Sequence, residues 1–293
     1  MIAMRDLRGI IPALLTPFAA DNTIDRGALR ALVRMNIEKG VSAFYVGGSS
    51  GEAFLLTADE RKTLLETVVD EVAGRCGVIA HIGAISQDTA EELARHARDN
   101  GADAVSSLPP FYYHFSFEEI KAYYFGIADA IDIPVILYNI PALSGVSLSV
   151  DDISGILGDS RFIGIKHTSS DFYMMNRIRA RFPDKFIFNG YDEMFVSGMA
   201  MGADGGIGTT YNFMADQFIK MWKLCRQGQY EKARALQSQA NQIIEALLRV
   251  GVLPGTKEIL RLMGLDVGVC RRPFRTLCDA EREMLRRASA ELL

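Results

Sequence analysis

The sequence contains few of the residues that build disulfide scaffolds or metal sites. Its 293 residues include four cysteines and four histidines. The cysteines form no Cys-x-x-Cys pair, and the histidines lack the spacing of zinc ligands. We therefore expect reduced thiols in a cytoplasmic protein and no metal site. The cysteines are Cys76, Cys225, Cys270 and Cys278, and the histidines are His81, His96, His114 and His167.

The chain also lacks an excess of one charge and a long hydrophobic run. The formal net charge is −4, from 32 basic and 36 acidic residues, so nothing favours binding to nucleic acid or to an anionic membrane. No segment is long and apolar enough to span a bilayer. Hydrophobic residues make up 49% of the chain, which is enough for a large core. We expect a small molecule as the binding partner.

Short apolar strands alternate with helical segments along most of the chain. The strands are apolar along their whole length, which is typical of parallel strands buried on both faces. About eight such units in residues 1–227 predict an α/β fold, a closed (β/α)8 TIM barrel. The predicted strands are Gly9–Leu15, Ser42–Val46, Val78–Ile82, Ala102–Leu108, Pro134–Tyr138, Phe162–Lys166, Phe186–Phe188 and Asp204–Ile207.

Residues 228–293 show helical patterns without further strands. No low-complexity linker precedes them, so we expect a C-terminal helical extension packed on the barrel and not an independent domain. The predicted helices are Glu231–Val250, Thr256–Met263 and Asp279–Leu292.

Functional residues of such barrels lie at the C-terminal ends of the strands, and one of these positions holds a lysine. The apolar strand Phe162–Lys166 ends at Lys166, and Thr168 follows soon after. Burial favours the neutral, nucleophilic form of an amine, which a Schiff-base enzyme requires. The alternative is an ordinary lysine that extends to solvent. His167 should point to the opposite side of the strand and be a core histidine.

Polar residues at other strand ends are expected on the same face. The turn Gly47–Glu52 can offer backbone N–H groups and hydroxyls to a small anion, although it also fits an ordinary tight turn. Tyr138 can move protons beside Lys166 or be an aromatic at the rim. Asp192 and Glu193 suit the hydroxyls of a polyol or the first turn of a helix.

Glycines and hydroxyls follow the last predicted strand. The segment Gly205–Thr210 fits a phosphate, as the last loops of barrels often do, or equally the tail of a sugar or keto acid. Each of these signals is weak alone, and their agreement on one face of the barrel carries the argument.

Together these segments resemble the N-acetylneuraminate lyase and dihydrodipicolinate synthase family of Schiff-base aldolases. The resemblance covers essentially the whole chain and is closest to the N-acetylneuraminate lyases. The segments that carry it are Gly47–Phe54, Pro110–Tyr113, Tyr138–Gly145, Gly190–Glu193 and Gly205–Asn212.

The resemblance implies that Lys166 forms an imine with C2 of a 2-keto acid, with no cofactor besides this covalent imine. Ser49 and Ser50 would hold the carboxylate, and Tyr138 would relay the proton of the C4 hydroxyl. Tyr112 would complete a hydroxyl relay with Ser49 and Tyr138, reaching from a neighbouring subunit of a homotetramer. The residues implied for the hydroxylated tail are Thr168, Gly190, Asp192, Glu193, Gly208 and Thr209.

Few residues distinguish the activities within this family. Dihydrodipicolinate synthases usually have an arginine soon after the Tyr-Asn-x-Pro segment, whereas this chain has Ala142–Ser144 there. The resemblance therefore implies reversible cleavage of N-acetylneuraminate, a sialic acid, to pyruvate and N-acetylmannosamine. The alternatives are dihydrodipicolinate synthesis, cleavage of another 2-keto-3-deoxy sugar acid, or a non-catalytic sugar-acid binding barrel. Ser50, where these lyases commonly have threonine, and Leu253, where some have an aromatic residue, leave the specificity of the pocket open.

Overall fold

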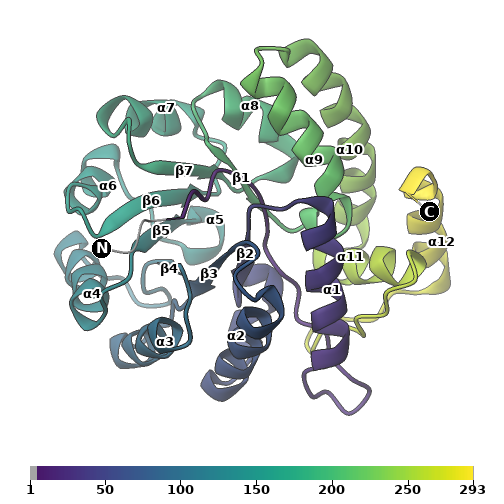
Figure 1. Cartoon of the computed structure of the whole chain (residues 1–293), viewed down its shortest axis with the longest axis horizontal. Helices are drawn as coiled ribbons and strands as arrows, with labels where there is room; N and C mark the ends of the chain where they lie inside the picture. Colours follow the sequence, from purple (N-terminus) through teal and green to yellow (C-terminus); the bar gives the residue numbers. More distant parts are fainter. Residues whose placement is uncertain (1–4, 293) are drawn as a thin grey trace.

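The computed structural model describes residues 5–292 and places eight parallel strands in a barrel (Figure 1). The strands follow one another in the order β1-β8-β7-β6-β5-β4-β3-β2. The barrel closes between β1 and β2, where the Ser42 N–H donates to the Ile10 carbonyl (3.0 Å) and the Leu14 N–H to the Tyr45 carbonyl (2.9 Å). The predicted TIM barrel is confirmed. The strands are β1 (Gly9–Pro12), β2 (Ala43–Val46), β3 (Gly77–His81), β4 (Ala104–Ser107), β5 (Val135–Asn139), β6 (Phe162–His167), β7 (Phe186–Asn189) and β8 (Gly205–Gly208).

Helices surround the strands, and local sequence signals fix several of their ends. Thr57 and Glu60 form a reciprocal capping box at the start of α2, which satisfies two free backbone N–H groups. Gly40 ends α1 with a positive φ of 88°, a conformation that glycine adopts without strain. The helices between the strands are α1 (Arg26–Lys39), α2 (Ala58–Val72), α3 (Gln87–Asp99), α4 (Phe117–Ala130), α5 (Pro141–Ser144), α6 (Val150–Leu157), α7 (Phe172–Arg181), α8 (Phe195–Ala200) and α9 (Tyr211–Arg226), with short 3-10 turns η1 (Ser49–Gly51), η2 (Ala53–Leu55) and η3 (Asp192–Met194).

The core consists of two hydrophobic layers separated by the barrel wall. Inward-facing strand residues, among them Ile11, Ile136 and Phe188, fill the barrel interior. Outward-facing residues such as Val105 and Ile165 pack against the helices. Because the strands are buried on both faces, their sequences are apolar throughout. No helix in residues 5–292 combines the length and apolarity needed to cross a membrane.

Three further helices follow α9 and gather beside it on one side of the barrel (Figure 1). They are α10 (Tyr230–Val250), α11 (Val252–Leu262) and α12 (Asp279–Ala288), followed by the 3-10 turn η4 (Ala290–Leu292). The helical extension is thus confirmed, and it packs on α9 and η3 of the barrel. The division of the chain after residue 227 stays a prediction, and residues 1–4 and 293 of the two predicted units lie outside the described part.

Some boundaries differ from those predicted. Strand β1 ends at Pro12 instead of Leu15, although Ala13 and Leu14 still donate hydrogen bonds to the neighbouring strands. Helix α9 begins at Tyr211 rather than near Ala215 and is kinked at Met214. Helix α11 begins four residues earlier than predicted, and α12 is shorter than predicted. The early start of α11 is possible because its proline lies in the first turn, where no backbone N–H is needed.

Candidate active site

Lys166 lies inside the mouth of the barrel, close to two phenol rings. Its side chain is only 4% exposed, and its Nζ lies 4.1 Å from the ring centroid of Tyr138 and 4.4 Å from that of Tyr45. Tyr138 is the residue paired with Lys166 in the register of β5 and β6. The lysine therefore points into the barrel, and the alternative of a strand-end lysine extending to solvent is wrong.

His167 points away from this face, as predicted. It is fully buried, and its ring nitrogens lie 3.1 Å from Asn139 Nδ2 and 3.1 Å from the Asp171 carbonyl oxygen. Burial lowers the pKa of His167, which favours the neutral ring. It is a hydrogen-bonded core histidine.

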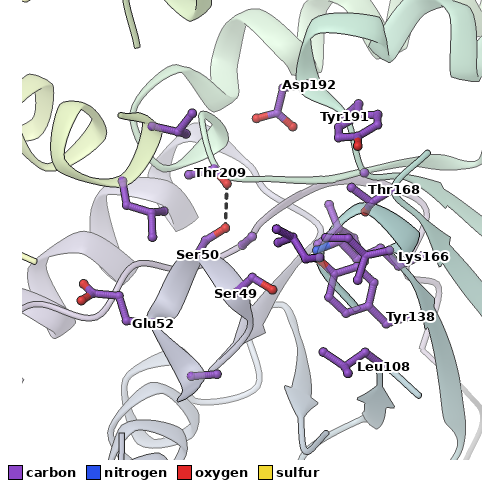
Figure 2. A pocket seen from close by; sticks show the side chains of 18 of the residues that line it. Ser49, Ser50, Glu52, Leu108, Tyr138, Lys166, Thr168, Tyr191, Asp192 and Thr209 are labelled. Carbon is purple, nitrogen blue, oxygen red and sulfur yellow. Dashed lines mark hydrogen bonds between the residues drawn. The ribbon is translucent and has the colours of Figure 1, made fainter. Parts of the chain in front are cut away.

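In the turn after β2, the serine turn Ser49–Gly51, Ser49 points toward Lys166 and Ser50 toward Thr209 (Figure 2). Ser49 and Ser50 open the 3-10 turn η1. The Ser50 hydroxyl is 2.6 Å from the Thr209 hydroxyl after β8. A Cβ at Gly48 would lie 2.6 Å from the ring of Tyr45, so the turn can approach Tyr45 this closely only with glycine there.

Asp192 is a buried carboxyl group held by the segment after β8. Its Oδ2 accepts hydrogen bonds from the Thr210 N–H (2.8 Å) and the Thr210 hydroxyl (2.7 Å). Its Oδ1 has no partner among the described residues. Burial raises the pKa of Asp192 to about 6. A Cβ at Gly208 would lie 1.8 Å from Oδ1, so this glycine makes room for the carboxyl group.

Thr168 and Gly190 form a similar close contact on the neighbouring strand ends. The Thr168 hydroxyl is buried without a hydrogen-bond partner among residues 5–292, and a Cβ at Gly190 would lie 1.8 Å from it. Leaving a buried hydroxyl unpaired costs free energy. A hydrogen bond with a ligand hydroxyl would remove this cost.

These groups line one cavity of about 660 Å³. Figure 2 shows the serine turn, Tyr138, Lys166, Thr168 and Asp192 around it. The outer wall comes from the helical extension and is apolar. The predicted site residues that line the cavity are Ser49, Ser50, Tyr138, Lys166, Thr168, Gly190, Asp192, Glu193 and Thr209, and the extension contributes Ile244, Leu247, Leu248, Val252 and Leu253.

Two predicted site residues do not line this cavity. Gly208 lies beneath Asp192, as described above. Tyr112 is 80% exposed with a positive φ of 81°, and its ring stacks edge-on against Tyr113. Within a single chain, Tyr112 is therefore not assembled with Ser49 and Tyr138.

Sequence reasoning did not find Tyr45 or, apart from Leu253, the apolar wall. Tyr45 lies inside a fully buried strand, where an aromatic residue is typical of the core. The wall residues belong to amphipathic helices whose apolar face suggested only packing on the barrel. No local signal in the sequence distinguishes Tyr45 or these wall residues from ordinary core residues. Over residues 5–292 no cluster of three or more His, Cys, Asp or Glu side chains is placed to hold a metal ion.

Comparison with known proteins shows which family this chain belongs to. The model of the dihydrodipicolinate synthetase family matches residues 6–291. The chain belongs to this family. An N-acetylneuraminate lyase of Rhizobium meliloti (strain 1021) is 47% identical over 98% of this chain and 96% of its own length.

Solved structures of the family have the same fold. The Clostridium difficile protein CdNal, in complex with mannosamine, superposes with a TM-score of 0.96 at 36% identity, covering 98% of this chain and 100% of its own. The N-acetylneuraminate lyase of Fusobacterium nucleatum complexed with pyruvate gives a TM-score of 0.93 at 35% identity, over 98% of this chain and 97% of its own. The family resemblance predicted from the sequence is confirmed.

Proposed function

We propose that this chain is a Schiff-base aldolase that reversibly cleaves N-acetylneuraminate to pyruvate and N-acetylmannosamine. One observation carries the proposal: the buried amine of Lys166 shares a cavity with Tyr138 and the serine turn. The 47% identity to an N-acetylneuraminate lyase supports the choice of substrate.

The chemistry begins at the amine of Lys166. It adds to the C2 ketone of the open-chain sugar acid, and loss of water gives a protonated imine. When the C3–C4 bond breaks, its electrons enter the imine to form an enamine. Tyr138 accepts the proton of the C4 hydroxyl as its own phenol proton passes on along the hydroxyl relay, and C4 becomes the aldehyde carbon of N-acetylmannosamine. The enamine then takes a proton at C3, and hydrolysis releases pyruvate and the free lysine.

The other polar groups hold the two ends of the substrate. The N–H groups and hydroxyls of Ser49 and Ser50 receive the carboxylate, because a turn of this kind offers several donors to one anion. The free oxygen atoms of Thr168 and Asp192, with Glu193 and Thr209, receive the sugar hydroxyls; Gly190 and Gly208 keep that space open. Two solved relatives are complexes with mannosamine and with pyruvate, which supports a cavity that takes a sugar and a keto acid.

Dihydrodipicolinate synthesis is less well supported by the cavity. The short helix α5 contributes Leu143 and Ser144 to the lining, and it carries no cation to bind a second carboxylate. The carboxyl groups of Asp192 and Glu193 would repel a dicarboxylic product, whereas they accept hydrogen bonds from a polyol. Retention of Lys166 and Tyr138 weighs against a non-catalytic binding barrel.

We extend the proposal to the oligomeric state of the enzyme and to its location in the cell. We infer a homotetramer in which the exposed Tyr112 reaches the site of a neighbouring subunit. We also infer a cytoplasmic enzyme, since Cys76, Cys225, Cys270 and Cys278 are all free thiols.

A substrate panel tests the proposal. N-acetylneuraminate, a 2-keto-3-deoxy sugar acid and, in the reverse direction, pyruvate with aspartate semialdehyde are offered to the wild-type enzyme and to Lys166→Ala. We expect pyruvate release from N-acetylneuraminate by the wild type and none by the variant, with similar melting curves. Preference for either other substrate would replace the assignment, and turnover by Lys166→Ala would refute the mechanism.

A further inference from the structure

A buried ion pair joins the helical extension to the serine turn. The Lys257 Nζ in α11 lies 2.9 Å from the Glu52 Oε1, and the two side chains are 2% and 0% exposed. The contact with Glu52 is an ion pair, and Lys257 donates its hydrogen bonds to the carbonyls of Thr16 (2.8 Å) and Val269 (3.1 Å). Removing two charges from water is costly, and only good geometry with further hydrogen bonds offsets that cost. A pair of this kind is therefore a specific feature of this place in the fold.

Glu52 connects this pair directly to the residues that face the substrate. It follows η1 immediately and has a positive φ of 59°, which is strained for a residue other than glycine. Its Oε2 accepts a hydrogen bond from the Arg271 N–H (2.8 Å). Figure 2 shows its carboxyl group on the far side of the turn, directed away from Lys166.

A hydrogen bond from the segment after β1 also holds the serine turn. The Thr16 hydroxyl donates to the Gly51 carbonyl (2.6 Å), and the Thr16 carbonyl is one of the acceptors of Lys257. The lysine thus fixes both Glu52 and the segment that supports Gly51. The conformation of η1 depends on contacts to residues about 200 positions further along the chain.

We propose that Lys257 is a positioning residue for the carboxylate end of the substrate. Through Glu52 it holds the backbone N–H groups of Ser49 and Ser50 in the geometry that receives the carboxylate of a 2-keto acid. It also neutralises the carboxyl group of Glu52, a residue of the cavity lining, and without Lys257 the charge of that group would repel the substrate carboxylate. The inference rests on the proposed function, and it makes the helical extension a part of the pyruvate subsite.

The chain offers a matched control in a second ion pair. Arg179 in α7 pairs with Asp204, which precedes β8 at the opposite end of the barrel. Its side chains are also mostly buried, at 22% and 13% exposed. Loss of this pair should lower stability without any effect on the carboxylate subsite.

The experiment compares Lys257→Met, Glu52→Gln, the double variant and Arg179→Met in the condensation of pyruvate with N-acetylmannosamine. We expect Lys257→Met to raise the KM for pyruvate about tenfold or more with kcat changed by less than about threefold, because ground-state binding is lost. The double variant should have a lower KM than Lys257→Met, since the unpaired carboxylate is gone. Arg179→Met should lower the melting temperature only.

Several outcomes would overturn the inference. One is a folded Lys257→Met variant whose KM for pyruvate is unchanged. Another is a KM for pyruvate that rises equally in Lys257→Met and Arg179→Met. If Lys257→Met does not fold, Glu52→Gln decides: a KM increase of about threefold or more supports the inference, and an unchanged KM overturns it. Wild-type enzyme that forms no adduct with pyruvate and borohydride would overturn the proposed function as well; an adduct with an unchanged KM overturns this inference alone.

Discussion

The two phenol rings in contact with Lys166 have different expected roles. Tyr138 lines the cavity, and its phenol belongs to the proposed proton relay. Tyr45 does not line the cavity, and its hydroxyl bonds to the Ser106 hydroxyl (3.1 Å) inside the barrel. Both rings bury the amine, but only one can exchange a proton with a substrate hydroxyl.

Phenylalanine at each position separates these roles. Tyr138→Phe should lower kcat about 10²-fold or more, since general acid–base catalysis supplies a factor of this size. It should still form the imine with pyruvate. Tyr45→Phe keeps the ring beside Lys166, so kcat should change little, with stability lowered by about 1 kcal/mol for the lost hydrogen bond. Steady-state rates give kcat and melting curves give the stability of both variants. An unchanged kcat in Tyr138→Phe would show that Tyr138 has no part in the mechanism.

The pKa of Asp192 gives a pH dependence of stability. The pKa is about 6 in the folded protein against an ordinary value of 3.8, so between these values the folded state binds more protons than the unfolded state. Stability contributed by this group is therefore highest below about pH 4, falls as the pH rises to about 6, and stays constant above that.

Asp192→Asn removes this titration while keeping an oxygen for the two Thr210 hydrogen bonds. The free energy of unfolding of Asp192→Asn relative to wild type should rise between about pH 4 and pH 6.5, by at most about 2–3 kcal/mol. Denaturant unfolding at several pH values measures it. A constant difference over this range would show that Asp192 titrates at its ordinary pKa.

The residues predicted from sequence are those at strand ends with polar side chains. Lys166 and Thr168 could be placed because polar residues at several strand ends were expected on one face of the barrel, and their agreement carried an argument that no single residue could carry. Tyr45 could not, because its polar atom is hydrogen-bonded inside the barrel and its ring packs like any core aromatic.

At the scale of elements, helix α10 supports the sugar end of the cavity. Gln237 donates to the Asp192 carbonyl (3.0 Å) and accepts from the Val196 N–H (3.1 Å). Asn241 donates to the Glu193 carbonyl (3.1 Å). The turn that carries the two carboxyl groups is thus held by the extension, as the serine turn is held by α11.

Gln237→Ala tests this support. It leaves a buried carbonyl and a buried N–H without partners, which costs about 1–3 kcal/mol of stability. The KM for N-acetylmannosamine should rise, while the KM for pyruvate stays near the wild-type value. Gln217→Ala is the control, because Gln217 bonds the Leu236 carbonyl away from the cavity. Equal changes in both KM values would contradict the role of α10.

The order of elements could be predicted because each strand is a buried apolar run that is interrupted by turn residues. Helix α5 was not predicted, since its four residues are too few for a periodic pattern. Apart from Leu253, which the family resemblance placed at the pocket, the contacts of α10 and α11 with the site could not be predicted either. They join residues far apart in sequence, and the amphipathic pattern of a helix does not say which part of the barrel it covers.

At the scale of the whole molecule, the proposed tetramer leads to a test of the role of Tyr112. If Tyr112 reaches into a neighbouring site, Lys166→Ala and Tyr112→Phe subunits can complement each other. Mixed by dissociation and reassociation, the two impaired variants should recover about a quarter of wild-type activity, because that fraction of sites combines an intact lysine with an intact tyrosine. Light scattering should give about four times the 32.3 kDa chain mass.

Tyr113→Phe is the matched control for this complementation, since Tyr113 is the exposed neighbour of Tyr112. It should be active without mixing. Absence of recovery in the Lys166→Ala and Tyr112→Phe mixture would place Tyr112 outside the site.

The central claim is that the amine of Lys166 captures a ketone. Borohydride reduction in the presence of pyruvate, followed by peptide mapping, tests it most directly. The account predicts one reduced pyruvate adduct per chain, on Lys166, and none on the Lys166→Ala variant. No adduct, or an adduct on another lysine with Lys166 unmodified, would contradict it.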